Sequence, residues 1–364
     1  MVNFLSKLIH SDLLKRSDDV VGVDIGSSAI KIVQIKKEAG ELVLGNYGSL
    51  ALGPYANVEV GQATGLSKGK IVEAFDVLLR ETGISVKEAA IAIPMKSAMF
   101  AVVEMPALKQ KQLDEIIPME ARKYIPVPIE EVALDYWVIP ARLSDGDAQK
   151  RKKVNVLIAA IHKETLNRHQ EIKSELGFLG NTFEIEIFST IRSVVGPETQ
   201  AVAVIDIGAS ATKVALIEYG TVRNTYLINK GSQDATLILS KSLSLSIAEA
   251  EEWKRHPERV NRNNASNVSR IVELAFAGIF SDVERVLSDY QKKYNTIIGK
   301  VILSGGGALS EKVRTLATTT LKKEIVVGDP FSRVQTPNTL QATLREIGPE
   351  FAVAVGVALS VLEA

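Results

Sequence analysis

Two short segments of the 364-residue chain carry the same polar residues at the same spacing, and their chemistry suits phosphate binding. In segments 23–32 and 205–214, Asp, Ile, Gly, Ser, Ala and Lys recur at equal offsets. Glycine lets backbone N–H groups approach an anion, serine adds a hydroxyl, aspartate can hold hydrated Mg²⁺, and lysine neutralises phosphate charge. The candidate binding residues are Asp24, Gly26, Ser27, Ser28 and Lys31 in the first copy, and Asp206, Gly208, Ala209, Ser210 and Lys213 in the second.

The elements around each copy follow from their apolar flanks. Each copy lies between two apolar runs, which predicts a strand, a turn and a returning strand; the runs are 20–23, 32–35, 201–205 and 214–217. A single copy is as typical of an ordinary hairpin turn as of a phosphate loop, but two copies with lysine at the same offset favour the phosphate loop. The copies lie 182 positions apart, half the chain length, so we expect two similarly built halves.

Further candidate residues follow the second copy in the chain. Gly231 precedes a helical pattern, Glu251 and Lys254 share one helix face, and an apolar strand over 301–304 runs into three glycines, Gly305, Gly306 and Gly307. The glycines permit a flat ligand such as adenine to pack on the backbone. Taken alone, the Glu–Lys pair also fits a solvated ion pair, and the glycines fit a tight strand–helix turn. The sequence contains neither a Walker A loop nor a dinucleotide-binding glycine motif.

Composition excludes several other classes of protein. The 43 Lys and Arg residues balance 43 Asp and Glu, which argues against bulk nucleic-acid binding. The absence of cysteine excludes disulfides, thiolate metal sites and cysteine nucleophiles, and the four histidines lack metal-ligand spacing.

The longest apolar run, 351–362, is shorter than the roughly 20 residues that a bilayer requires, and we expect neither a secretory signal nor a transmembrane helix. Residues 2–16 have helical spacing that fits either a membrane-surface helix or packing on the protein or a partner.

In their order along the chain, these motifs resemble those of the actin-like ATPase superfamily, which includes actin and the FtsA family. The resemblance covers residues 20–362 and implies an α/β fold with two duplicated domains around a cleft that holds ATP and Mg²⁺. The resemblance implies that Asp24 and Asp206 bind the Mg²⁺ ion and that Glu251 and Lys254 contact ribose and adenine. It also implies that Gly305–Gly307 form the adenosine motif. It also implies a catalytic carboxylate at Glu184 and a connecting helix over 352–359.

The segment between residues 90 and 160 indicates which family within the superfamily the chain resembles. Its Ile93-Pro94, Met105-Pro106 and Glu120–Pro128 blocks are similar to those of the PilM family of type IV pilus assembly proteins, which are FtsA-like with a small insertion. The periodicity predicts a helix over 113–125, strands over 132–141 and 154–160, and a polar turn over 144–153. We expect an N-terminal segment 1–19, a first domain 20–200 with an insertion at about 99–160, and a second domain 201–364 with a smaller subdomain at about 231–299.

The PilM resemblance implies a cytoplasmic ATP-binding adaptor at the inner face of the cytoplasmic membrane. Such an adaptor would bind the short cytoplasmic tail of a PilN-like membrane protein, contact pilus motor ATPases and meet the membrane only through its partners. The alternative is a filament-forming ATPase of the cytoskeleton or of cell division, like FtsA or actin. Both functions use the same cleft, so the motifs leave the rate of hydrolysis and the oligomeric state open; we expect at most slow hydrolysis.

Overall fold

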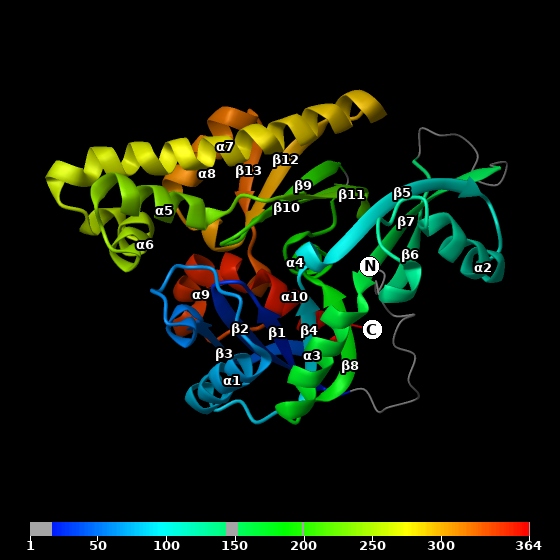
Figure 1. The fold of residues 1–364 in the computed structure, drawn as a ribbon, viewed down its shortest axis with the longest axis horizontal. Helices are drawn as coiled ribbons and strands as arrows, with labels where there is room; N and C mark the ends of the chain where they lie inside the picture. The colour runs from blue at the N-terminus through cyan, green and yellow to red at the C-terminus, as the bar shows by residue number, and fades with distance from the viewer. Residues whose placement is uncertain (1–16, 143–151, 199, 364) are drawn as a thin grey trace.

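The computed structural model describes residues 17–142, 152–198 and 200–363, which form two halves with a small insertion in the first (Figure 1). The first half contains β1 (Asp19–Ile25), β2 (Ala29–Glu38), β3 (Glu41–Ala51), α1 (Lys68–Thr82), β4 (Glu88–Ile93), α3 (Lys163–Glu175), β8 (Leu179–Ile185) and α4 (Glu186–Val194). The insertion, between β4 and α3, contains β5 (Ala98–Pro106), α2 (Gln110–Ala121), β6 (Val132–Ile139) and β7 (Lys153–His162). The second half contains β9 (Ala201–Ile207), β10 (Thr212–Glu218), β11 (Thr221–Ile228), α5 (Ser232–Leu243), α6 (Ile247–Arg255), α7 (Arg262–Tyr294), β12 (Ile298–Ser304), α8 (Glu311–Leu321), β13 (Glu324–Val327), α9 (Gln341–Ile347) and α10 (Ala352–Leu362).

The two halves repeat one sheet. Their strand orders are β3-β2-β1-β4-β8 and β11-β10-β9-β12-β13. In both sheets the central strand pairs antiparallel with the strand that follows it and parallel with the strand on its other side. The predicted actin-like α/β fold with a duplicated architecture is therefore confirmed, whereas the exact domain boundaries stay predictions.

Helix α10 follows the second half in the chain but packs in the core of the first half. Nearly all of its residues are buried, as expected for a helix that is apolar on every side. It packs on α4 and on β1, and the approach is close because two glycines lie at the contacts. A side chain at Gly356 would collide with the Ser189 carbonyl of α4, and one at Gly22 would collide with the Ala354 carbonyl of α10. The expected connecting helix at 352–359 is this helix, extended to Leu362.

The insertion is a three-stranded sheet, β5-β7-β6, with α2 on one face. Alternate residues on β7 divide between two cores: Val156, Ile158 and Ala160 pack with α2, whereas Leu157 and Ile161 pack with the first half. The predicted helix and the strands β6 and β7 are present, but β5 has no counterpart among the expected strands. The predicted polar turn lies almost entirely outside the described residues.

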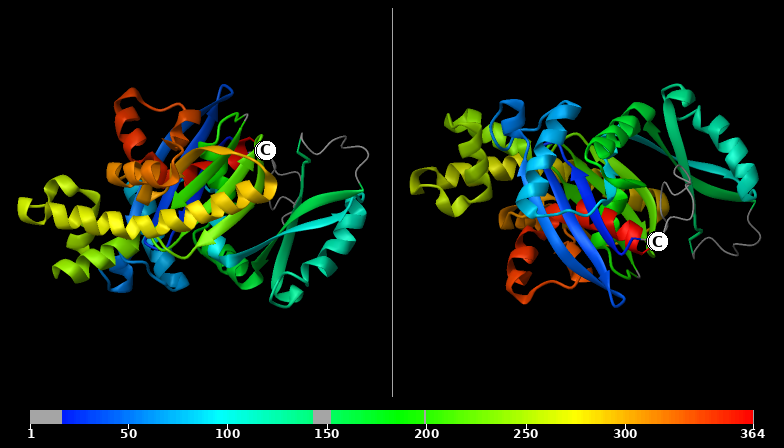
Figure 2. Two further views of the ribbon diagram at one scale, coloured as in Figure 1. Left: turned by 90° about the horizontal axis from the view of Figure 1, so that it is seen from above. Right: turned by 90° about the horizontal axis from the view of Figure 1, so that it is seen from below.

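Helices α5 and α6 form the end of the second half that lies farthest from the insertion, and the long helix α7 runs from them back toward the insertion (Figure 2). They pack together around Leu239, Phe276 and Phe280 of a buried cluster. Among the described residues, no helix combines the length and the apolar character that crossing a membrane requires. The segment 2–16, for which the sequence leaves two roles open, lies outside the described residues.

Candidate functional site

The two repeated motifs fold into the same turn. In the first, Asp24 near the end of β1 lies opposite Lys31 on β2, and the Gly26 N–H donates to the Ala29 carbonyl at 3.0 Å. In the second, Asp206 lies opposite Lys213, and the Gly208 N–H donates to the Ala211 carbonyl at 3.0 Å. Each turn thus places an aspartate and a lysine side by side next to a glycine-containing loop.

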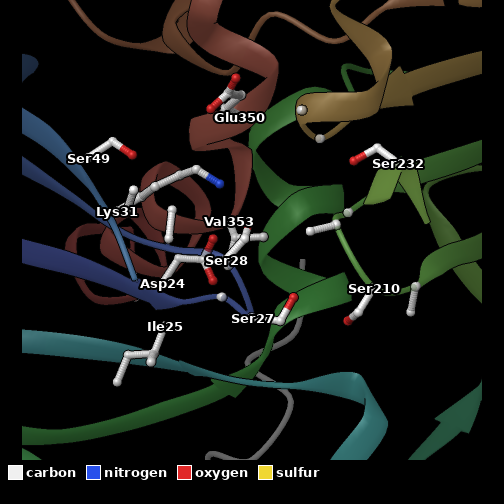
Figure 3. Close-up of a pocket in the computed structure, with 18 of the residues that line it drawn as sticks. Asp24, Ile25, Ser27, Ser28, Lys31, Ser49, Ser210, Ser232, Glu350 and Val353 are labelled. Carbon is white, nitrogen blue, oxygen red and sulfur yellow. The ribbon is translucent and has the colours of Figure 1, made fainter. Parts of the chain in front are cut away.

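Both turns line one pocket between the halves, with a cavity volume of about 630 Å³ (Figure 3). In the close-up, Asp24, Ser27, Ser28 and Lys31 approach from one side and Ser210 from the other. This volume lies within the usual range for small-molecule sites. The predicted residues that line the pocket are Asp24, Gly26, Ser27, Ser28, Lys31, Asp206, Gly208, Ala209, Ser210, Lys213, Glu251, Lys254, Gly305 and Gly306.

Carboxylates surround Lys213 at the centre of the pocket. Its Nζ lies 2.9 Å from Glu186 Oε2 and 3.1 Å from Asp206 Oδ2. Burial opposes the charged lysine, but the two carboxylates outweigh burial and raise the pKa of Lys213 above its ordinary value. Burial raises the pKa of Asp24 to about 6; Glu186 and Asp206 add to the rise, while Lys31 and Lys213 oppose it. Asp24 therefore carries a negative charge that a bound cation would stabilise.

A second polar network lies at the end of the pocket formed by α5 and α6. Glu251 accepts hydrogen bonds from Thr236 Oγ1 and Lys254 Nζ, both at 2.6 Å, and from Arg255 Nε at 2.8 Å. Burial acts to raise the pKa of Glu251, but Lys254 and these hydrogen bonds together hold the pKa below its usual value. Arg255 also pairs with Glu350 at 3.0 Å, which joins α6 to the segment before α10. The network presents fixed donors and acceptors that suit a sugar and a base.

Glu184, the predicted catalytic carboxylate, does not line the pocket. It is buried and pairs with Arg192 of α4, whose second guanidinium nitrogen donates to Glu184 Oε1 at 2.6 Å. Ser189 donates to Glu184 Oε2 at 2.7 Å, and Arg192 also donates to the Gly356 carbonyl of α10 at 3.1 Å. The structure thus places Glu184 in the packing between α4 and α10 and not among the residues that line the pocket, and its catalytic role stays a prediction.

Two predicted glycines lie behind the pocket surface. A side chain at Gly231 would collide with the Ala209 carbonyl of the second turn, so this glycine supports the turn from behind. A side chain at Gly307 would collide with Ile207, which shows that Gly307 serves the packing of β9. Neither residue lines the pocket, whereas Gly305 and Gly306 do.

The sequence interpretation missed several polar residues that line the pocket. Among them are Glu186, Ser232, Arg255 and Glu350. Glu186 directly follows β8, and its Oε1 accepts a hydrogen bond from the Met95 N–H at 2.7 Å. The sequence offered a signal for two of them, since Glu186 lies two residues after Glu184 and Arg255 lies four residues after Glu251 on the same helix face.

The donor set fits Mg²⁺ when a phosphate is present. Asp24, Asp206 and Glu186 bring carboxylates from both halves to one pocket, and Mg²⁺ is usually held by one or two carboxylates together with phosphate oxygens and water. Within the described part of the chain, no group of three or more His, Cys, Asp or Glu residues is arranged to hold a metal ion. Mg²⁺ bound here would be held by these carboxylates together with phosphate oxygens and water.

Comparisons with solved structures agree with this fold. A chain of a PilM–PilN type IV pilus biogenesis complex matches with a TM-score of 0.81 and 23% identity, over 96% of this chain and 100% of that one. The ethanolamine utilization protein EutJ from Carboxydothermus hydrogenoformans matches with a TM-score of 0.55 and 17% identity, over 97% and 93% of the two chains. MreB5 of Spiroplasma citri bound to AMPPNP matches with a TM-score of 0.51 and 10% identity, over 94% and 95%.

Sequence comparisons give the family. The cell division protein FtsA of Bacillus subtilis (strain 168) is 24% identical over 356 residues, which cover 85% of this chain and 78% of FtsA. A family model described as type IV pilus assembly protein PilM matches residues 22–362. Because that match spans both halves, the insertion and both phosphate-type turns, the chain belongs to the PilM family of type IV pilus assembly proteins.

Proposed function

We propose that the pocket binds ATP together with Mg²⁺. The observation that carries this proposal is the convergence of the two turns, because each contributes an Asp and a Lys to the same cavity. Asp24 and Asp206 would hold the ion with phosphate oxygens, and Lys31 and Lys213 would neutralise phosphate charge. The ion supplies charge neutralisation at the phosphates. A nucleotide-bound relative with the same fold, MreB5, supports the proposal.

The reaction at this pocket is slow or absent. Glu186 replaces Glu184 as the carboxylate within the pocket, but its two oxygens are engaged by Lys213 and the Met95 N–H. A general base must reach the water that it deprotonates, and an engaged carboxylate is a poor base. The main role of nucleotide is therefore to set the relative position of the two halves.

The partner is the cytoplasmic N-terminal tail of a PilN-like membrane protein, and the protein works as an adaptor at the cytoplasmic face of the inner membrane. Family membership supports this assignment, as does the shared fold with the chain from the PilM–PilN complex. At the cytoplasmic face of the inner membrane the protein would also contact the pilus motor ATPases. It would associate with the membrane only through its partner proteins.

The insertion provides the surface for the tail. Strand β5 is an edge strand of its sheet, and an extended peptide can add to such an edge through main-chain hydrogen bonds. Phe100 and Val102 of β5 and Trp137 of β6 are half-buried against a core cluster that is formed mainly by the first half and also includes residues of the second half's sheet. They offer apolar contacts between the insertion and the first half, where alternate side chains of a short tail would lie.

Calorimetry with a synthetic PilN-like tail tests the adaptor function. Deleting the whole insertion is unsuitable, because Leu157 and Ile161 belong to the core of the first half. We therefore choose Val102→Lys, with Met119→Lys on the exposed face of α2 as the matched control. The Val102 variant should lose tail binding and keep ATP binding, whereas the control should keep both. If the Val102→Lys variant still bound the tail, the partner site would have to lie elsewhere on the protein.

The similarity to FtsA favours one second candidate, a filament-forming ATPase. Sedimentation with Mg²⁺ and ATP separates the two functions. Nucleotide-dependent pelleting without tail binding would support the filament, whereas tail binding by a non-pelleting protein supports the adaptor.

A further inference from the structure

The insertion is part of the first half by chain connection, yet it is also fastened to the second half. After β6, Arg142 reaches Glu218 at the end of β10, with Nε 2.8 Å from Oε2 and the second guanidinium nitrogen 3.3 Å from Oε1. The Glu218 side chain is only 3% exposed and that of Arg142 is 18% exposed. This is a bidentate ion pair with little access to water, so it is screened far less than a surface pair.

Other groups surround this pair and fix its geometry. The Tyr290 hydroxyl donates to Glu218 Oε1 at 2.8 Å and accepts from Arg142 at 3.0 Å, and the Arg142 guanidinium lies 4.2 Å from the ring centre of Tyr294. From β11, Arg223 donates to the Pro140 carbonyl, and its Nε lies 3.2 Å from Glu218 Oε2. We call this cluster the Arg142 clamp; its members are Pro140, Arg142, Glu218, Arg223, Tyr290 and Tyr294.

The clamp joins specific elements of the two halves. Pro140 and Arg142 follow β6 of the insertion, whereas Glu218, Arg223 and the two tyrosines belong to β10, β11 and α7 of the second half. Strand β6 itself lies beside β11 (Figure 1). The layer of α5 and α6, which forms the other end of the pocket, lies far from the insertion in both views of Figure 2.

Rotation of the halves must therefore act on the insertion. If the clamp holds, the insertion follows the second half and slides against the first half. If the clamp opens, Glu218 keeps Arg223 and Tyr290 but loses its bidentate partner in a site with almost no water, which is unfavourable.

We propose that the Arg142 clamp makes the insertion follow the second half, and so transmits the nucleotide-dependent angle between the halves to the groove that binds the tail. This inference rests on the proposed function for the identity of both ligands. The mechanical part stands without it, since the clamp is made of residues of this chain alone.

A distance measurement tests the mechanical part. The chain has no cysteine, so Met119→Cys on α2 and Leu274→Cys on α7 give two exposed label sites without background. Spin-label distances should form one narrow distribution in the parent and a broader one after Arg142→Ala. The control is Arg122→Ala, which removes the same charge from an exposed pair with Glu130 inside the insertion. Equal widths in the parent and Arg142→Ala would overturn the inference.

A binding measurement tests the transmission. The ratio of tail affinities with and without Mg²⁺ and ATP should depart from one in the parent by at least threefold, and Arg142→Ala should bring it toward one while each ligand still binds. Arg142→Lys keeps the charge but loses the bidentate geometry, so it should give an intermediate ratio and a native thermal transition. A parent ratio of one, or an unchanged ratio in Arg142→Ala, would overturn the inference. A parent that binds no tail or no ATP would instead refute the proposed function. The distance measurement would still show whether the clamp fastens the insertion to the second half.

Discussion

Glu184 and Glu186 lie two residues apart but in different environments. Glu184 pairs with Arg192 in the core, whereas Glu186 pairs with Lys213 in the pocket. The division occurs at the junction of β8 and α4, where the chain changes from strand to helix after Ile185. We therefore expect one carboxylate to contribute to stability and the other to ligand chemistry.

Substituting these two residues separates the roles. Glu186→Gln should abolish whatever ATP turnover exists and retain ATP binding, because the amide cannot accept a proton from water. Glu184→Gln should retain the turnover per folded molecule but lower the free energy of unfolding by about 3–5 kcal/mol, since it breaks a buried ion pair. Turnover assays and denaturant unfolding check both. Parent turnover near 10 per second, which is typical of metabolic enzymes, would contradict the adaptor function.

The aspartates of the two turns should be required for metal-dependent binding. Asp24→Ala and Asp206→Ala are each expected to weaken Mg²⁺-dependent ATP binding by at least about tenfold, or 1.4 kcal/mol, and to keep the fold. Calorimetry measures the affinity and circular dichroism checks the fold. Asp76→Ala on the exposed face of α1 is the control and should bind like the parent. Unchanged affinity in both pocket variants would refute the assignment of the site.

Binding should depend on pH through Asp24. Because its pKa is about 6 in the folded protein, Asp24 takes up a proton as the pH falls from 7 to 5, and the affinity for Mg²⁺ with ATP should fall over that window. The stability of the unliganded protein should respond with the opposite sign. The unfolded chain has the lower pKa, 3.8, so Asp24 costs stability above pH 6, and this cost is relieved between pH 6 and 4.

Asp24→Asn provides the comparison for this pH dependence. The variant should bind weakly at every pH and show a flatter dependence of unfolding free energy between pH 4 and 7. Calorimetry and urea unfolding across that range measure both slopes. A parent and a variant with parallel stability profiles would show that Asp24 does not titrate in this window.

Two glycine substitutions test the close packing of α10. Gly356→Ala should lower the unfolding free energy by about 1–3 kcal/mol, because the added methyl meets the backbone of Ser189 in a filled core. Gly69→Ala in α1 should instead raise it by about 0.5–1 kcal/mol, since nothing lies near that position and alanine favours the helix. Urea unfolding of the two variants should therefore give shifts of opposite sign.

The duplicated turns could be predicted because a short local motif carries both their shape and their chemistry. Asp24 and Lys31, like Asp206 and Lys213, are brought together by one hairpin, so their spacing in the sequence is enough to pair them. The two halves followed from the repetition of that motif.

The features that escaped prediction depend on contacts between distant segments. The choice between Glu184 and Glu186 depends on where β8 ends, and nothing in the local sequence marks that residue. Strand β5 is covered on both faces, by α2 and by the first half, so it lacks the apolar–polar alternation that predicts a half-exposed strand. Arg142 and Glu218 lie 76 positions apart in different halves, and only the folded chain shows that they meet.

The burial of β1 by α10 also orders the events of biosynthesis. Strand β1 spans Asp19–Ile25, and α10, the helix that seals one face of its sheet, spans Ala352–Leu362. Val20, Val33 and Ala90 therefore remain uncovered until almost all of the described chain has left the ribosome. Contacts between segments this far apart in sequence slow folding. They also leave an intermediate with exposed apolar surface that is prone to aggregate. We therefore expect the nascent first half to be the stage of synthesis at which this protein is most prone to aggregate.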